Sequence, residues 1–163
     1  MVLYVGGTQL TQGKLLNLVQ NDTTGQTGVT SESFTAGNLS ASITPSATNS
    51  GILVIANFRT HTYQSSGTAC YHRCAIYRQI NSGGYSLSYP ASVNITNGYS
   101  DGEAKERAAY QQMCFAYKDA PGTTNQVDYK VYLRRDTSSS GTANFGGSSH
   151  QCTMTLLEIA GAG

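Results

Sequence analysis

The fold is decided by the stretch Val127-Asp128-Tyr129-Lys130-Val131-Tyr132-Leu133-Arg134. Its odd-numbered residues are all apolar or aromatic, and charged residues fill three of its four even-numbered positions. Successive residues of a β-strand point to opposite faces, so a period of two is the signature of a half-buried strand. We therefore expect a strand here, with its odd-numbered side chains in the core and its even-numbered side chains toward solvent.

Similar stretches recur along the chain and are separated by turn-forming residues. Further strands are expected at Lys14–Gln20, Leu39–Ile43, Ile52–Phe58, His72–Ile80, Tyr85–Tyr89, Ser92–Asn97, Ala108–Lys118 and Cys152–Ile159. The stretch Ile52–Phe58 is nearly apolar on both faces, which predicts a strand buried between two layers. Loops are expected at residues 23–32, 44–51 and 137–147, and a short helical patch at 101–107.

This series of elements predicts an all-β protein. About eight to ten strands at short spacing are typical of a sandwich or a barrel, and the strand number favours a jelly-roll β-sandwich. The length of 163 residues is that of one domain of ordinary size. We assign residues 1–13 to an N-terminal arm and residues 14–163 to a single jelly-roll domain.

Composition excludes several classes of partner. The net charge is +1, which does not attract nucleic acid, and no run of 18 apolar residues predicts insertion into a membrane. Residues 1–7 lack the basic start and the apolar length of a secretory signal. Charged residues make up 12% of the chain, about half the usual ~25%, so we expect flanks that neighbouring subunits cover.

No catalytic motif is present in the sequence. The chain lacks a Gly-x-Ser-x-Gly elbow, a His-Glu-x-x-His pair and a phosphate-binding glycine loop. Its acidic cluster, Asp101, Glu103 and Glu106, is interleaved with Lys105 and Arg107, as in a solvated charged loop. We expect neither enzymatic activity nor a cofactor.

Cysteine and histidine alternate in two segments. Cys70, His72 and Cys74 would share one face of a strand, and His150 and Cys152 repeat the same spacing. If the two segments lay side by side, these residues would offer ligands for a tetrahedral zinc ion. The spacing differs from that of the common zinc motifs, so a metal site is the least favoured of three interpretations.

Buried free thiols are the favoured state of the cysteines, and disulfides formed after release from the cell are the second alternative. Cys70 and Cys74 in an extended strand would be about 13 Å apart, beyond the roughly 7 Å that a bridge allows. Cys114 and Cys152 occur in apolar strand contexts, where a free cysteine packs as a small hydrophobic residue.

The tyrosines fall into two groups. One group lies in or beside the loops between residues 60 and 100, where exposed rings would stack on sugars or contact a protein partner; it comprises Tyr63, Tyr71, Tyr85, Tyr89 and Tyr99. Packing within the sandwich is the alternative for this group. The second group sits within the expected strands, where the tyrosines are expected to pack as part of the sandwich; it comprises Tyr77, Tyr110, Tyr117, Tyr129 and Tyr132.

Three segments together resemble a known family. They are Lys14-Leu15-Leu16 with Gln20 and the stretch Leu39–Val54; Asp119–Thr124 followed by Tyr129–Val131; and the ending Thr153–Ala160. Their order and spacing resemble the small tail-fibre-like and structural surface proteins of tailed bacteriophages, especially those of cyanobacteria. The resemblance implies a virion surface protein assembled in the host cytoplasm, with a jelly roll similar to tumour-necrosis-factor-like domains and a homotrimeric state. Gly51 replaces the lysine that is common there, the cysteines at 70–74 are not a family feature, and residues 60–105 match nothing.

Two functions are compatible with this resemblance. The first is a capsid decoration or cement protein that binds the major capsid protein or another virion protein. Its N-terminal arm would supply the capsid contact through Leu3, Tyr4, Val5 and Leu10, ordering on binding, and the chain has no room for a fibre shaft. The second is the tip of a tail or head fibre, whose loop tyrosines would bind a host-surface glycan. A secreted signalling or lectin-like trimer is a distant third, because no signal peptide is found.

Overall fold

The computed structural model describes residues 14–64, 70–98, 107–136, 141–147 and 150–161, together with the backbone of two short strands in the N-terminal arm. Only the backbone is described at 63–64, 70, 90–98 and 107–109. The arm strands are β1 (Tyr4–Val5) and β2 (Thr8–Gln9), which pair antiparallel.

The central strand of the larger sheet is β6 (Gly51–Gln64). One edge of β6 pairs over almost its full length with β9 (Arg107–Asp119). The other edge pairs first with β12 (Cys152–Ile159) and then with β11 (Thr142–Gly146). Outside these two lie β3 (Leu15–Thr23), beside β12, and β4 (Gln26–Val29), beside β11. All these pairs are antiparallel, and together they form a six-stranded sheet.

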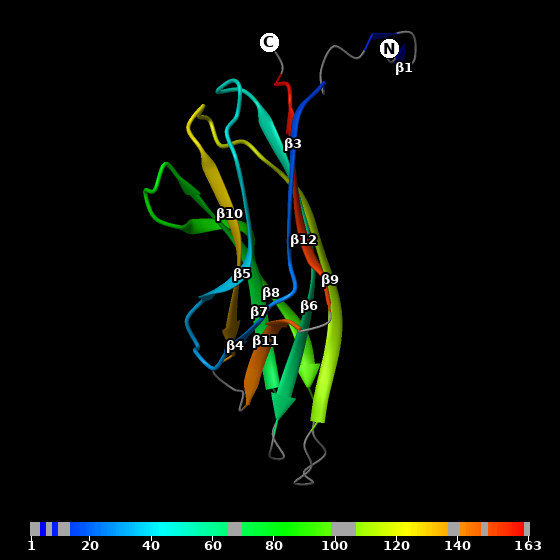
Figure 1. Ribbon diagram of the computed structural model, residues 1–163, viewed down its shortest axis with the longest axis vertical. Coiled ribbons are helices and arrows are strands. Elements are labelled where there is room, and N and C mark those ends of the chain that lie inside the picture. Colours follow the sequence, from blue (N-terminus) through cyan, green and yellow to red (C-terminus); the bar gives the residue numbers. More distant parts are fainter. Residues whose placement is uncertain are drawn as a thin grey trace.

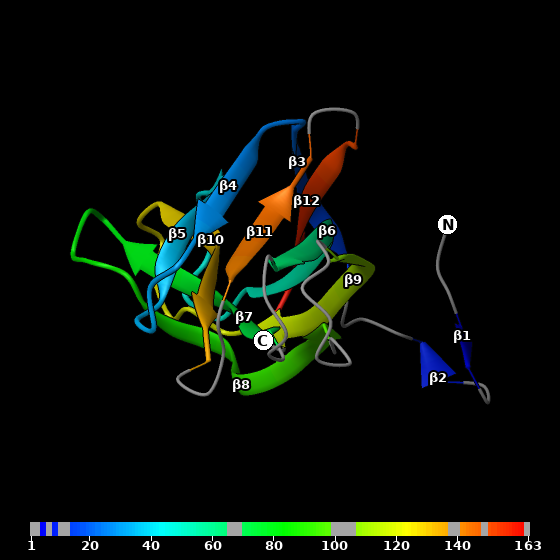
Figure 2. The same cartoon turned by 90° about the horizontal axis from the view of Figure 1, so that it is seen from below.

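The second sheet has four strands in the order β5-β10-β7-β8. They are β5 (Thr35–Ile43), β10 (Val127–Arg135), β7 (Cys70–Ile80) and β8 (Ser86–Gly98), again all antiparallel. The strands run roughly along the long axis of the molecule, and the two sheets pack against each other across it, as Figures 1 and 2 show. The chain is therefore an all-β sandwich, as its alternation predicts.

The core fills the space between the sheets. The odd-numbered side chains of β10, from Val127 to Leu133, are completely buried, and so are Ile52, Val54, Ala56 and Phe58 of β6. The Phe58 ring packs edge-on against Phe115, with ring centroids 5.4 Å apart, and also contacts Phe145 at 5.2 Å. Aromatic pairs in these arrangements add to the stability gained from burial.

A buried carboxylate fixes the connection between β5 and β6. Glu158 on β12 is 1% exposed and accepts hydrogen bonds from the Ser46 amide and the Ser46 hydroxyl, both at 2.6 Å, and from the Ser50 hydroxyl at 2.7 Å. Burial alone would raise the pKa of this carboxyl, but the hydrogen bonds outweigh it and the pKa is lowered. The expected loop at 44–51 is thus a fixed connection, ending where β6 begins at Gly51.

Several expected boundaries were wrong. Strand β4 lies within the expected loop at 23–32, and β11 lies within the expected tip at 137–147. These short Gly- and Thr-rich segments pair with each other, and β11 also pairs with β6, so partners distant in sequence supply the hydrogen bonds. Strand β3 continues through Asn21-Asp22, and the two expected strands at 85–97 form the single strand β8.

Two further expectations have mixed outcomes. Ile52–Phe58 is fully buried only on its inner face, since Leu53 and Ile55 are half-buried on the outer one. The expected helical patch falls at 101–106, outside the described residues, and Arg107 already begins β9.

Candidate functional site

The outer face of the six-stranded sheet carries two rows of largely uncharged side chains. Register places Leu18, Leu157 and Leu53 opposite one another on β3, β12 and β6, and this row ends at the exposed Lys118 of β9. The next row contains Gln20, Thr155, Ile55 and Ala116. On β3 the side chains of Leu15, Leu16 and Leu18 are 50%, 41% and 54% exposed. Exposed leucines on adjacent positions of one sheet form an apolar patch, and such patches often mark interaction surfaces. We call this set of two rows with the β3 leucines the leucine face.

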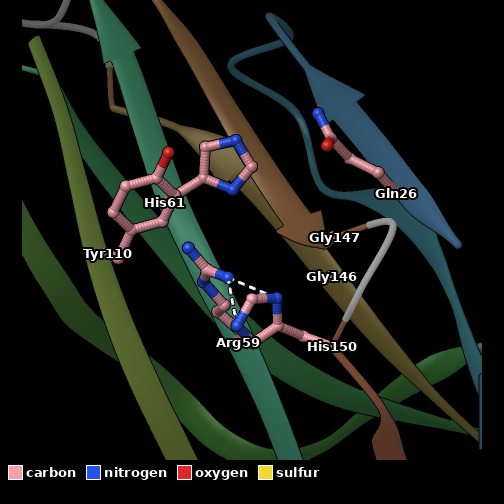
Figure 3. A pocket seen from close by; sticks show the side chains of 7 residues that line it. All are labelled: Gln26, Arg59, His61, Tyr110, Gly146, Gly147 and His150. Carbon is pink, nitrogen blue, oxygen red and sulfur yellow. Dashed lines mark hydrogen bonds between the residues drawn. The ribbon is translucent and has the colours of Figure 1, made fainter. Parts of the chain in front are cut away.

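At the opposite end of the same face, the side chains of β6 change to basic ones and line a pocket of about 270 Å³. Its walls come from β6, β9, β4 and the segment between β11 and β12 (Figure 3). The lining residues are Gln26, Arg59, His61, Tyr110, Gly146, Gly147 and His150. None of these seven is a carboxylate.

Arg59 is the central cation of this pocket. Its guanidinium lies 4.0 Å from the centre of the Tyr110 ring, in a cation–π contact. Its Nη1 also contacts the His150 ring, 2.6 Å from Nε2 (Figure 3). The His61 ring lies 5.2 Å from that of Tyr110, because register pairs the two residues across β6 and β9.

The electrostatic environment of His61 reflects this basic surrounding. Burial lowers the pKa of the imidazole, the Arg59 charge lowers it further, and the Gly146 backbone acts in the opposite direction. The His61 Nδ1 atom is buried and has no hydrogen-bond partner among the described residues. The pocket therefore holds positive charge and a hydrogen-bonding atom that the described protein groups do not satisfy.

The outer face of the four-stranded sheet carries a chain of aromatic rings. Phe34, Tyr77, Tyr132 and Tyr85 follow one another with centroid separations of 5.6, 4.3 and 5.7 Å. Arg134 lies 5.4 Å from the Phe34 ring centre, and Lys130 lies 5.6 Å from that of Tyr85. We call these four rings the aromatic strip.

This strip corrects the sequence-based assignment of the strand tyrosines. Tyr77, Tyr110 and Tyr132 were expected to pack as part of the sandwich. Tyr77 and Tyr132 lie half-buried on its outer face, where the alternation of residues 127–134 also places Tyr132, and Tyr110 is 60% exposed. Each of the three occupies a strand position whose side chain points away from the opposite sheet. Only Tyr117 and Tyr129 of that group pack toward the interior, where burial is the largest cause that raises the pKa of each phenol.

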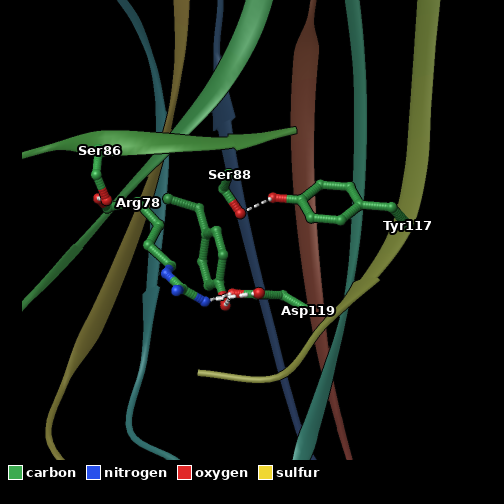
Figure 4. Close-up of polar contacts among 6 residues, drawn as sticks. Arg78, Ser86, Ser88, Tyr117 and Asp119 are labelled. Carbon is green, nitrogen blue, oxygen red and sulfur yellow. Dashed lines mark hydrogen bonds and ion pairs between the residues drawn. The ribbon is translucent and has the colours of Figure 1, made fainter. Parts of the chain in front are cut away.

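Polar contacts join the sheets at the edge formed by β8 and β9. Asp119, at the end of β9, accepts hydrogen bonds from Arg78 at 2.6 Å and from the Tyr129 hydroxyl at 2.7 Å. The Tyr117 hydroxyl donates to Ser88 at 2.9 Å (Figure 4). These groups satisfy one another, so we assign them a structural role.

The loop tyrosines have separate environments. Tyr85 belongs to the aromatic strip, while Tyr89 on β8 stacks on Tyr117 with centroids 4.4 Å apart. Tyr71 is half-buried on β7. The side chain of Tyr63 and all of Tyr99 lie outside the described residues, as do the side chains of Tyr4 and Val5 and all of Leu3 and Leu10.

The Cys and His segments do not come together as one site in the part of the chain that is described. His72 and Cys74 are completely buried on β7, and Cys152 is buried on β12 of the other sheet. His150 is exposed and contacts Arg59 instead. No group of three potential ligands that could hold a metal ion is found among the described residues. The Cys70 side chain is not among them.

The thiols whose side chains are described are free. Cys74 and Cys152 belong to the apolar core, as expected for small hydrophobic residues, and burial strongly raises the pKa of the Cys74 thiol. The expectation for Cys114 was wrong, since this thiol is exposed. It occupies an even position of β9, whose odd positions Met113 and Phe115 face the core.

Comparisons with known proteins add little. No protein-family model matches the chain, and neither does any curated protein. The chain is similar to one in the structure of infectious bursal disease virus Gx strain, with 10% identity and a TM-score of 0.36 over 99% of this chain and 44% of that one. A chain in the structure of infectious bursal disease virus Gt strain is similar with 8% identity and a TM-score of 0.35, over 98% of this chain and 44% of that one. The chain spans less than half the length of either. The likeness is slight, and the function is inferred below from the chain's own residues.

The described residues contain no helix with the length and apolar character needed to cross a bilayer.

Proposed function

We propose that this chain is a non-enzymatic structural protein of a bacteriophage particle, which trimerises through its leucine face and decorates the capsid. The phage resemblance of the three sequence segments supports this proposal. The strand order supports it too. Without β11 and β4, which extend the larger sheet, β3-β12-β6-β9 faces β5-β10-β7-β8. Two four-stranded sheets of this kind are the arrangement of a jelly roll.

The observation that carries the proposal is the exposure of leucine on β3. Leu18 is 54% exposed beside the half-buried Leu157 and Leu53, and the following row has no charged side chain. Depletion of charge at the centre of a contact is typical of interface cores. Burying the remaining exposed part of such side chains contributes about 25 cal/mol for each Å² removed from water. A second copy of this chain is therefore the occupant that we assign to the face.

Sedimentation equilibrium on the full chain tests this assembly. We expect a species of three times the 17.3 kDa chain mass, and we expect Leu18→Glu to shift it toward monomer. Leu87→Glu is the matched control, because Leu87 is 43% exposed but lies on β8 of the other sheet. A monomeric wild type overturns the trimer, and a Leu18→Glu variant that stays trimeric overturns the assignment of the face.

The location on the particle is tested by electron microscopy of phage particles labelled with an antibody to this chain. Labelling of heads supports decoration, while labelling confined to tail or fibre tips contradicts it. Deletion of residues 1–10 tests the arm, whose backbone forms the β1–β2 pair. We expect this deletion to abolish binding to heads without changing the sedimentation of the isolated protein.

The aromatic strip favours a second candidate function, the tip of a fibre that binds a host-surface glycan. Partly exposed rings of Tyr77, Tyr132 and Tyr85 on one face offer surfaces on which sugar rings stack. Adsorption of the isolated trimer to host cells, and its loss in Tyr132→Ala, would support this function. Full adsorption by Tyr132→Ala would contradict a role of the strip.

A further inference from the structure

We propose that the pocket around Arg59 binds an oxyanion carried by a small ligand, with the carboxylate of an acidic monosaccharide as the form that fits best. The proposal depends neither on the trimer nor on the particle, because the lining residues that define the pocket come from one chain.

The charge of Arg59 is the first argument. Its described contacts are the face of Tyr110 and the ring of His150, neither of which carries a negative charge at neutral pH. Other arginines of the chain behave differently, since Arg78 is paired with Asp119 at 2.6 Å and Arg73 with Asp136 at 3.0 Å. A guanidinium fits a carboxylate, sulfate or phosphate with two parallel hydrogen bonds. The pocket thus presents a cation whose described neighbours leave it without a counter-ion.

The second argument is the hydrogen-bonding capacity around this cation. The buried Nδ1 of His61 has no partner among the described residues, and a buried nitrogen without a hydrogen bond is destabilising. Because the Gly146 backbone already bonds the His61 ring and a neutral imidazole carries one N–H, this nitrogen is an acceptor, to which a hydroxyl of the sugar would donate. Gly146 and Gly147 on the rim have no side chain that would narrow the pocket. A side chain at position 147 would contact both Arg59 and His150.

The size of the pocket selects the ligand class. A volume of about 270 Å³ lies just below the roughly 300–1,000 Å³ of pockets for drug-sized molecules. It exceeds what a lone inorganic ion needs and suits a single sugar ring with its carboxylate. The exposed Tyr110 ring at the rim supplies an apolar surface for the sugar ring.

The pocket does not overlap the leucine face, although both lie on the outer side of the same sheet. Arg59 lies six residues from Leu53 along β6, about 20 Å at ~3.3 Å per residue.

The experiment is a calorimetric and NMR titration of the full chain with three probes: D-glucuronate, D-glucose and inorganic sulfate. We expect glucuronate to bind and to shift the backbone signals of Gly146 and Gly147, and glucose, which lacks the carboxylate, not to bind. Binding of sulfate without glucuronate would confirm the oxyanion site and contradict the sugar. Absence of binding by both anions would overturn the proposal.

Two substitutions connect the binding to the pocket. Arg59→Gln is expected to weaken glucuronate binding at least tenfold, and His61→Asn to weaken it less. Arg135→Gln is the matched control, because Arg135 lies on β10 of the other sheet, is paired with Glu32 and is not part of the aromatic strip. Equal binding by Arg59→Gln and Arg135→Gln would overturn the site. NMR spectra of the core show whether each variant is folded, and His61→Asn provides the test if Arg59→Gln is not.

Discussion

The buried histidine of β7 makes the stability of this protein depend on pH in a calculable way. The His72 side chain is completely buried, and burial lowers its pKa from 6.5 to about 4, with a smaller contribution from the charge of His61. The unfolded chain therefore binds a proton at a higher pH than the folded one. The part of the folding stability that depends on a neutral His72 is fully present above the unfolded pKa of about 6.5. It is lost as the pH falls from about 6.5 toward 4.

The size of this effect follows from the shift. A difference of one pKa unit corresponds to 1.36 kcal/mol, so the full loss below the folded pKa is about 3 kcal/mol. Between pH 7 and pH 5 the same relation gives about 2 kcal/mol. His61 contributes in the same direction, because its pKa is also lowered. The titratable and charged groups near His61 among the described residues are Arg59, Tyr110, His150 and His72, so no carboxylate there offsets its lowered pKa.

Urea unfolding at pH 7 and pH 5 measures this loss. The chain has 11 tyrosines and no tryptophan, so tyrosine fluorescence or circular dichroism reports the transition, at one fixed protein concentration because an oligomer's stability depends on it. We expect His72→Gln to be less stable at pH 7 but to lose about 2 kcal/mol less than wild type on acidification. His150→Gln, which removes an exposed imidazole, should keep most of the wild-type loss. If the free energy of unfolding of His72→Gln falls as much as that of wild type between pH 7 and pH 5, His72 is not the cause of the pH dependence.

Three further predictions concern other buried or constrained groups. Glu158→Gln should lower the free energy of unfolding by about 1–3 kcal/mol, because three donors lose an ionised acceptor, whereas the exposed Glu32→Gln should change it by less than about 1 kcal/mol in the same urea titration. Gly146→Ala should lower the midpoint of thermal unfolding, since Gly146 has φ +75° and an added Cβ would overlap the Gly25 carbonyl oxygen; a midpoint equal to that of wild type would contradict this. Iodoacetamide should modify Cys114 and leave the buried Cys74 intact in the native protein, as judged by peptide mass spectrometry, and equal labelling of both would refute the assigned burial.

The sequence predicted the strands whose alternation is long and clear. Strand β10 was read with the correct buried face, and β12 has the predicted bounds, because burial of one face imposes a period of two on the residues themselves. Strands β4 and β11 carried no such signal. Their Gly- and Thr-rich segments become strands only because they find each other and β6 in the folded chain.

The candidate sites were harder to predict for a related reason. The pocket joins Arg59 and His61 of β6 with Tyr110 of β9 and His150 before β12, and Arg59 and His150, which are in contact, are 91 residues apart. Only the alternation of Arg59 and His61 on one strand face is local, and without the register of β6 and β9 it does not point to Tyr110. The inner or outer position of a strand tyrosine likewise depends on which face the neighbouring apolar residues bury.

The outer faces of the two sheets differ in chemistry, and under the proposed function this difference decides which surface assembles and which is left to recognise a partner. The leucine face offers apolar side chains that make few specific contacts with water, so covering it with a second copy loses little hydration. The aromatic strip carries Lys130 and Arg134 against its rings, and burying these cations in an interface would cost desolvation that the rings alone do not offset. Because the two sheets enclose the core between their inner faces (Figures 1 and 2), their outer faces point in opposite directions. An assembly through the leucines would therefore leave the aromatic strip outward. If the strip binds a host glycan, as in the second candidate function, Tyr132→Ala should lose host adsorption without any change in the sedimentation of the protein.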